Sequence, residues 1–218
     1  MKKKTIVVLT LAAAMMLSLG ACRGSYKNPI SNLIDVPCDD KPVIYLYPQE
    51  STKVDVKLTL DGTLTCTYPV SDGTWSVTAN PDGTLIGENG MEYNYLYWEG
   101  KSATEFDLSE GFCVAGEDTA AFLEEALDNL GLTRKEANEF IVYWLPRMQE
   151  NAYNVISFQK EVYTDSAKLE VTPTPDTMLR VFMAWKPSEN YVNLPAQELQ
   201  GPEREGFTVV EWGGIELK

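Results

Sequence analysis

Histidine is absent from the 218 residues of this chain. Its absence excludes Ser-His-Asp and Cys-His catalytic arrangements and zinc sites with imidazole ligands. Basic residues are also scarce, because 18 Lys and Arg stand against 32 Asp and Glu, which leaves a formal net charge of −14. A phosphate backbone is bound through a basic surface, so we expect no nucleic-acid partner.

The chain also lacks the loops that commonly hold phosphates or calcium. Neither G-x-x-x-x-G-K-[ST] nor G-x-G-x-x-G occurs, and no loop matches D-x-[DN]-x-[DN]-G. We therefore expect no cofactor and no metal.

The first 21 residues have the layout of a bacterial export signal. Three lysines at 2–4 precede an apolar run at 6–19, which is shorter than the roughly 17–25 residues that span a bilayer. The run ends in Leu-Gly-Ala-Cys, which resembles the lipobox of bacterial lipoproteins and predicts Cys22 as the lipid attachment site. Residues 1–21 are then a signal peptide and residues 22–41 a polar tether. The alternative is an ordinary secreted protein that is cleaved nearby.

Three further cysteines would lie outside the cytoplasm, where disulfides form. An odd number leaves at least one cysteine free or paired between molecules. Cys38 precedes one predicted strand and Cys66 lies inside another, and we expect these two to be bonded. Cys113, between two apolar neighbours, is typical of a small buried residue.

Residues 42–100 have the pattern of short antiparallel strands. Residues 53–60 alternate polar and apolar side chains, Asp61-Gly62 is a hairpin signal, and residues 63–68 form the returning strand. Residues 91–98 predict a further strand. This spacing of strands and turns favours a small sandwich.

Residues 101–218 add helices to this pattern. A helix that begins after Gly116 and ends before Gly131 is followed by Thr133-Arg134-Lys135-Glu136, a capping box for a second helix that Pro146 ends or kinks. The short link predicts an antiparallel helix hairpin. Further strands are expected near 154–162, 167–172, 177–185 and 207–212. The predicted class is a β-rich α+β fold, in which 42–100 and 101–218 are two parts or one unit, 42–218.

An aromatic row is the first candidate binding feature. On a strand, Tyr93, Tyr95 and Tyr97 share one face, with Trp98 on the other. Such rings stack on sugars, so Tyr93, Tyr97, Trp98 and Trp212 are predicted to contact a glycan. The alternative is that the row packs in the core.

Two carboxylates are the candidates for catalysis. Glu99 and Glu211 each adjoin a tryptophan near a predicted strand end. A pair of this kind could cleave glycosidic bonds as acid and base, or as acid and nucleophile. The alternative for both residues is surface solvation.

Five short segments stand out together: KPVIYLYP at 41–48, YNYLYWEG at 93–100, YWLPRM at 143–148, RVFMAWK at 180–186 and EWGG at 211–214. As a set they resemble a family of uncharacterised secreted or lipid-anchored bacterial proteins. The resemblance implies one folded unit and transfers no site residue.

These features predict a lipid-anchored extracytoplasmic protein of the bacterial cell membrane. Its favoured role is a non-catalytic module that binds a glycan, a peptide or another envelope protein. The alternatives are a carboxylate-dependent hydrolase or lyase that acts on envelope polysaccharide, and a structural lipoprotein.

Overall fold

The computed structural model describes residues 38–218. The predicted signal peptide, Cys22 and the tether as far as residue 37 lie outside the described residues. Within the described part, no helix is both long and apolar enough to cross a membrane.

The elements follow one another in this order: β1 (Cys38–Tyr47), β2 (Thr52–Leu60), β3 (Gly62–Tyr68), β4 (Thr74–Ala79), β5 (Leu85–Gly87), β6 (Glu92–Tyr93), β7 (Leu96–Ser102), β8 (Phe112–Ala115), η1 (Gly116–Asp118), α1 (Thr119–Asn129), α2 (Arg134–Met148), β9 (Tyr153–Gln159), α3 (Glu161–Ser166), β10 (Ala167–Thr172), β11 (Thr177–Ser188) and β12 (Thr208–Glu216). The predicted β-rich α+β class is confirmed.

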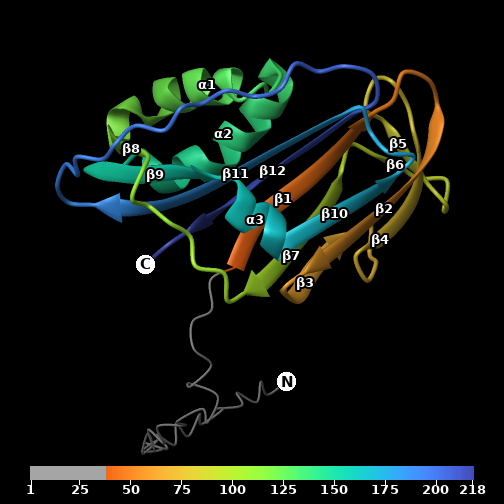
Figure 1. Cartoon of the computed structure of the whole chain (residues 1–218), viewed down its shortest axis with the longest axis horizontal. Helices are drawn as coiled ribbons and strands as arrows, with labels where there is room; N and C mark the ends of the chain where they lie inside the picture. Colours follow the sequence, from red (N-terminus) through yellow and green to blue (C-terminus); the bar gives the residue numbers. More distant parts are fainter. Residues whose placement is uncertain (1–37) are drawn as a thin grey trace, which may run out of the picture. The chain divides into compact units, whose positions relative to one another are not determined.

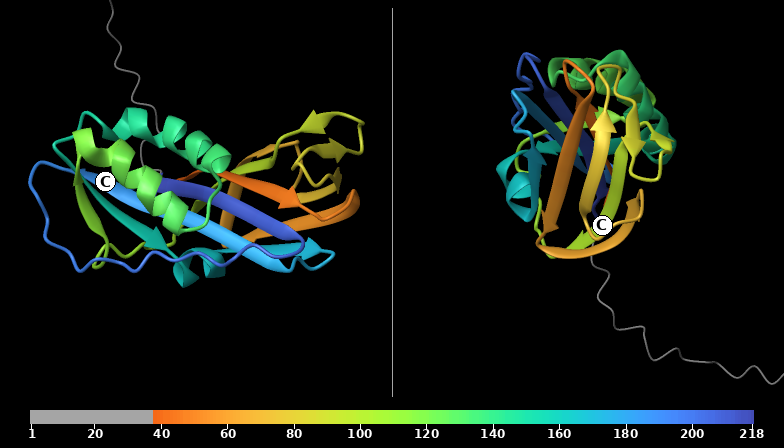
Figure 2. Two further views of the ribbon diagram at one scale, coloured as in Figure 1. Left: turned by 90° about the horizontal axis from the view of Figure 1, so that it is seen from above. Right: turned by 90° about the vertical axis from the view of Figure 1, so that its right-hand side faces the viewer.

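A seven-stranded sheet forms the middle layer, in the order β3-β7-β1-β12-β11-β9-β8. Only the β11–β12 pair in it is parallel. A five-stranded sheet, β10-β2-β4-β5-β6, packs on one face, and α1 and α2 cover the other (Figures 1 and 2). The molecule therefore has two cores, one between the sheets and one under the helices.

Strands from both sides of residue 100 occur in each sheet. β1 pairs with β12, and β2 pairs with β10. β1 also begins earlier than the predicted strand, because the backbone of Cys38 already pairs with Lys101. The last residues of the predicted tether therefore belong to the sheet.

The predicted helix hairpin and its capping box are confirmed. The Thr133 hydroxyl accepts from the Glu136 backbone N–H, and the Glu136 carboxylate accepts from the Thr133 backbone N–H. Pro146 lies in the last turn of α2, which continues to Met148. The apolar stripe around Phe140 and Trp144 is fully buried against the sheet.

Two predicted strands differ from the observed ones, since one is interrupted and the other ends early. The segment 91–98 divides into β6 and β7, which belong to different sheets. The segment 154–162 ends as a strand at Gln159, and α3 then leads into the second sheet. In both places the chain passes from one sheet to the other, so a single strand cannot continue.

A long irregular segment, residues 189–207, connects the parallel strands β11 and β12, and we call it the strap. It crosses the outer face near the helices (Figure 1). Backbone hydrogen bonds attach it along its length: Gly111 N–H donates to Pro195 O and Gly201 N–H donates to Asn129 O, both at 2.9 Å, and Phe207 O accepts from the N–H groups of Asp176 and Thr177.

Candidate functional site: a groove beside the strap

Glu211 and Trp98, both predicted site residues, lie in the core between the two sheets. Glu211 and Trp98 are fully buried. The Trp98 Nε1–H donates to Glu211 Oε1 at 3.0 Å, and the Arg180 Nε–H donates to Glu211 Oε2 at 2.5 Å. Burial opposes the charge on Arg180, but the attraction of Glu211 outweighs it, so the pKa of Arg180 is raised. Glu211 is thus one half of a buried ion pair.

The predicted pairing of Glu99 with Glu211 is wrong. Trp98 faces the core between the sheets, so its neighbour Glu99 in β7 points to the opposite face, the side on which the helices pack. β1 also separates β7 from β12. Two carboxylates on opposite faces of one sheet cannot flank a single glycosidic bond.

The predicted aromatic platform does not form a single surface. Tyr93 belongs to β6 and packs against the core between the sheets, whereas Tyr95 and Tyr97 pack against the helix-side core. Trp212 is fully buried, with the Lys41 ammonium 5.6 Å from its ring centroid. The row fails because the chain changes sheets between Tyr93 and Leu96.

The predicted Cys38–Cys66 disulfide is also wrong. Cys66 is free and exposed. The backbone of Cys38 pairs with Lys101 and that of Cys66 with Glu99, so β7 lies between the two cysteines. Two strand spacings amount to about 9.6 Å, while bonded cysteines have Cα atoms about 4.4–6.8 Å apart. Cys113 is half-buried and free.

The structure instead shows a groove at an unpaired edge of β11. β9 pairs with β11 only from Phe182 to Ser188. Before Phe182, no strand among residues 38–218 pairs with this side of β11. The first five residues of β11, 177–181, therefore pair on one side alone, with β12.

The direction of the free backbone groups follows from the alternation along β11. The Thr177 N–H donates to Phe207 O, and Trp185 O accepts from the Leu217 N–H, so odd-numbered residues face β12. Even-numbered residues face the other side, where Phe182 pairs with β9. Met178 and Arg180 thus present their backbone N–H and C=O groups to the groove, and the Met178 residue is 37% exposed.

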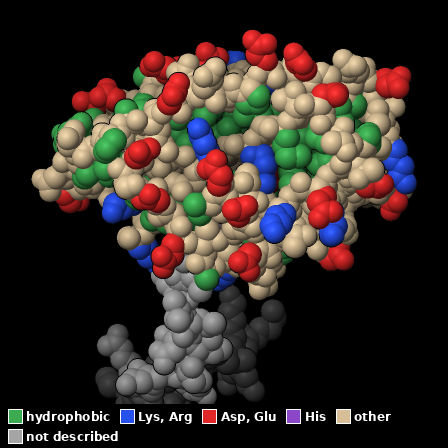
Figure 3. Space-filling view, viewed as in Figure 1, with side chains coloured by type: hydrophobic (Ala, Val, Ile, Leu, Met, Phe, Trp, Pro, Cys, Tyr) green, Lys and Arg blue, Asp and Glu red, His purple; other side chains and the backbone are tan. Residues whose placement is uncertain are grey.

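The groove has a volume of about 380 Å³ and combines apolar walls with a few charged groups. Its lining includes Leu130, Phe158, Lys160, Leu179, Arg180 and Pro202. A second hollow of about 460 Å³ shares residues 158–161 with it and continues along the strap. In the space-filling view of this face, hydrophobic side chains gather in a depression beside Lys and Arg side chains (Figure 3).

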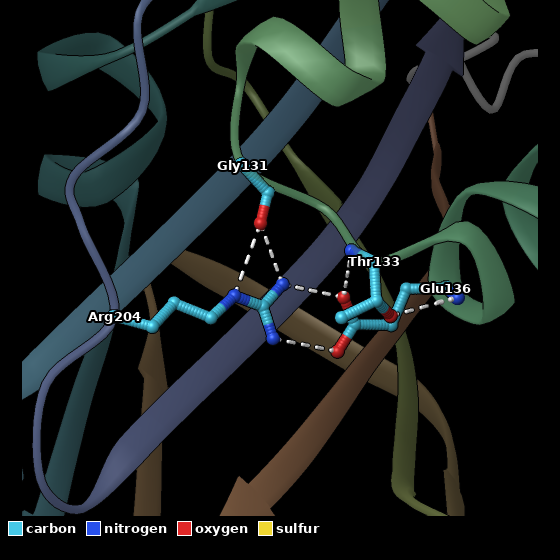
Figure 4. Close-up of polar contacts among 4 residues, drawn as sticks. All are labelled: Gly131, Thr133, Glu136 and Arg204. Atoms are coloured by element: carbon cyan, nitrogen blue, oxygen red, sulfur yellow. Dashed lines mark hydrogen bonds and ion pairs between the residues drawn. The ribbon is translucent and has the colours of Figure 1, made fainter.

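The strap wall of the groove is held by a buried ionic cluster (Figure 4). Arg204 donates from Nε and Nη2 to Gly131 O at 3.0 and 2.7 Å. Its Nη1 and Nη2 donate to the two carboxylate oxygens of Glu136 at 3.1 and 2.5 Å. This fork ties the strap to the link between α1 and α2, so the wall has a fixed position.

Gln197 in the strap closes the neighbouring edge of β9. Its amide accepts from Phe158 N–H at 2.8 Å and donates to Phe158 O at 3.1 Å. A side-chain amide there takes the place of an adjacent strand. The edge of β11 has no such substitute among the described residues, since no side chain bonds the Met178 or Arg180 backbone.

Comparison with known proteins places the chain in a family without assigned function. A protein of Butyrivibrio fibrisolvens described as "Uncharacterized protein in bglA 3'region" is 43% identical over 103 residues, which are 46% of this chain and 99% of that protein. The chain belongs to the family of that protein. No family model and no solved structure matches it. The relative therefore supplies a family but no chemistry.

Sequence reasoning missed the groove for an identifiable reason. The unpaired edge of β11 exists because β9 ends at Gln159 while β11 extends past it. No short sequence motif specifies the register between two strands. Lys160-Glu161, where the apolar run of β9 stops, was the available signal. The described residues contain no group of three or more Cys, Asp or Glu side chains arranged to hold a metal.

Proposed function

We propose that this chain is a lipid-anchored extracytoplasmic module that binds an extended peptide segment of another envelope polypeptide. The peptide lies in the groove and adds a strand to the edge of β11. The export features of residues 1–22 support the location, and the groove supports the ligand class. A peptide is favoured over a glycan because the aromatic residues that suggested sugar stacking do not share a surface.

The observation that carries this proposal is the unpaired backbone of Met178 and Arg180. Each of these residues directs one N–H and one C=O group to the groove. The two residues are two positions apart, which is about 6.7 Å along a strand. An extended peptide is the ligand that presents complementary groups at this spacing, as in β-strand addition. A sugar does not present alternating donors and acceptors at this regular spacing.

The walls of the groove supply the other part of the affinity. A net contribution of about 0.5–1.5 kcal/mol per backbone hydrogen bond is too small to hold a short peptide. Leu130, Leu179 and Pro202 line the groove and can cover apolar side chains of the ligand. The ligand we expect is therefore an extended segment with alternating apolar residues.

The test uses the full chain in detergent micelles and a display library of random seven-residue peptides. We expect selected peptides to be β-prone, and we expect Met178→Pro to weaken their binding at least tenfold. Proline removes the Met178 N–H, one of the two that face the groove, and it is tolerated at a strand edge because that N–H has no partner within the described residues. Met178→Ala is the matched control, because it removes the side chain but keeps the N–H.

A second arm probes the ligand instead of the protein. In a selected peptide, N-methylation at alternate residues should abolish binding in one register and leave it nearly unchanged in the other. Equal binding by Met178→Pro and Met178→Ala, together with no alternation in the N-methyl series, would rule out strand addition. Enrichment of no peptide at all would rule out the proposed function itself.

A further inference from the structure

We propose that the groove selects a peptide with a carboxylate side chain, Asp or Glu, at the position opposite Arg180. This inference rests on the proposed function, because it assigns the chemistry of one residue in the added strand. It is carried by the orientation of Arg180 and by the hydrogen-bonding groups that its guanidinium leaves unused.

The alternation along β11 decides which ligand side chain meets Arg180. Phe182 packs in the core between the sheets, whereas Leu179 and Val181 pack in the helix-side core. Arg180 therefore points to the same side as Phe182, toward α3. In paired strands, directly opposite residues place their side chains on the same face. The ligand residue opposite Arg180 thus faces the guanidinium, and its two neighbours face Leu130 and Leu179.

Not all N–H groups of the Arg180 guanidinium are used by Glu211. Its Nε–H bonds to Glu211, and the Tyr163 side chain also interacts with the guanidinium. Nη2 is buried and makes no close hydrogen bond, while the side chain as a whole is 8% exposed and lines the groove. The face of the guanidinium lies over the Tyr163 ring at 4.7 Å, which holds its plane in place. An unpaired buried donor is costly, so the site favours a ligand that supplies an acceptor.

A carboxylate is the acceptor that fits a guanidinium fork best, because two parallel N–H···O bonds can form at once. The other charges that line the groove are Lys160 and Glu161, which balance each other. Glu211 balances Arg180, so the selection depends on directed hydrogen bonds and not on a positive surface. A lysine or arginine at the same ligand position would place its charge against Arg180 and is expected to be rejected.

The test compares three acetylated heptapeptides, Thr-Val-Leu-Xaa-Leu-Val-Thr, in which Xaa is Asp, Asn or Leu. With the full chain we expect the Asp peptide to bind about tenfold more tightly than the Leu peptide, and the Asn peptide to lie between them. The variant Arg180→Met/Glu211→Gln removes both charges together and keeps an acceptor for Trp98. In it the Asp-to-Leu ratio should fall to about one.

Matched variants keep the result interpretable. Lys57→Met/Glu170→Gln removes an exposed ion pair that does not line the groove, and its Asp-to-Leu ratio should equal that of the unmodified chain. If the Arg180/Glu211 variant fails to fold, Arg180→Lys keeps the charge but loses the fork, and the ratio should still drop.

The outcomes separate the two proposals. Equal binding of all three peptides, with binding still sensitive to Met178→Pro, would overturn the carboxylate selection and leave strand addition standing. A full ratio retained by Arg180→Lys would also overturn it. Binding of none of the three peptides, with none enriched from the library, would overturn both.

Discussion

At the scale of single residues, one buried carboxylate connects three parts of the molecule. Glu136 is fully buried, caps the start of α2 through the Thr133 N–H, and receives both terminal nitrogens of Arg204 from the strap. Arg204 in turn satisfies Gly131 O, just after the end of α1. Loss of either charged partner would leave the other polar group buried without compensation.

Removal of the Arg204 side chain should therefore destabilise the folded protein. We expect Arg204→Ala to lower the free energy of unfolding by about 3 kcal/mol, because Glu136 and Gly131 O lose their partner. Urea denaturation followed by tryptophan fluorescence would measure it. Arg134→Ala is the control, since Arg134 pairs with Glu124 on the surface at 2.8 Å and such pairs contribute at most about 1 kcal/mol. Equal losses in the two variants would contradict the role assigned to the fork.

The same cluster predicts how stability depends on pH. Burial alone would raise the pKa of Glu136, but the hydrogen bonds from Arg204 and from the Thr133 backbone outweigh it, so the pKa lies below its usual value of 4.5. A lowered folded-state pKa stabilises the protein above the unfolded-state pKa, and this stabilisation is lost as the pH falls through the folded-state value. We expect the urea concentration at the midpoint of unfolding to decrease as the pH is lowered below about 4.5.

Glu136→Gln provides the comparison for this pH dependence. The variant should be less stable at pH 7 and should lose less stability between pH 5 and pH 3 than the unmodified chain, because it has no proton to take up at this site. Parallel curves for the two proteins across that range would show that other carboxylates determine the acid limb.

Sequence alone predicted one half of this cluster. The capping box could be read from Thr133 and Glu136 because its partners are three residues apart. Arg204 comes from the strap, and no local pattern links it to α2. Glu211 was noticed as a carboxylate beside a tryptophan, but its partner Arg180 meets it only through the parallel pairing of β11 and β12. In these two clusters the local interaction was predictable and the long-range ones were not, whereas the local hairpin expected at Asp61-Gly62 does not form because β2 and β3 belong to different sheets.

At the scale of elements, the two glycines after Trp212 let β12 sit close to its neighbours. A Cβ on Gly213 would lie 2.9 Å from Pro42 Cγ in the bulge of β1. A Cβ on Gly214 would lie 2.6 Å from Met183 O and 2.7 Å from Trp144 Cζ2. The Gly-Gly step thus sets the approach of α2 to the middle sheet.

Gly214→Ala should separate α2 from the sheet. The obstructing Met183 atom is backbone, which cannot rotate away, and we expect a loss of about 1–3 kcal/mol in the free energy of unfolding. Gly87→Ala is the matched strand control, because its Cβ would meet the ends of the Asn89 and Tyr93 side chains, which can move. The measurement is urea unfolding of both variants. A smaller loss for Gly214→Ala than for Gly87→Ala would contradict the packing argument.

The regular elements were predictable where one physical signal dominated. Residues 53–60 alternate strictly and form β2, whose buried residues are Val54, Val56 and Leu58. The segment 91–98 was wrongly predicted as one strand, because its tyrosines have a high β-propensity in either sheet. The change of sheet at residues 94–95 depends on how two sheets stack, which a single-strand pattern does not contain.

At the scale of the whole molecule, the five segments at 41–48, 93–100, 143–148, 180–186 and 211–214 lie mostly in the middle sheet and in α2. They supply β1, β7, β11, β12 and the end of α2, where Trp98, Trp144, Trp185 and Trp212 are all fully buried. Their residue choices are explained by packing and by the buried Arg180–Glu211 pair. The segment at 180–186 supplies Arg180, Val181 and Phe182 to the groove lining, and the other lining residues lie outside the five segments.

The remaining whole-molecule proposal is the lipid anchor, which would hold this acidic body at the outer face of the membrane. We expect the chain to incorporate a clickable palmitate analogue and to sediment with membranes, because diacylglycerol on Cys22 anchors stably where one acyl chain would be marginal. Cys22→Ser should lose the label and the sedimentation together. Cys66→Ser is the control, since Cys66 is an exposed free thiol and its loss should change neither. An unlabelled chain in the cytoplasm that still carries residues 1–21 would show that the peptide in the groove must be sought inside the cell.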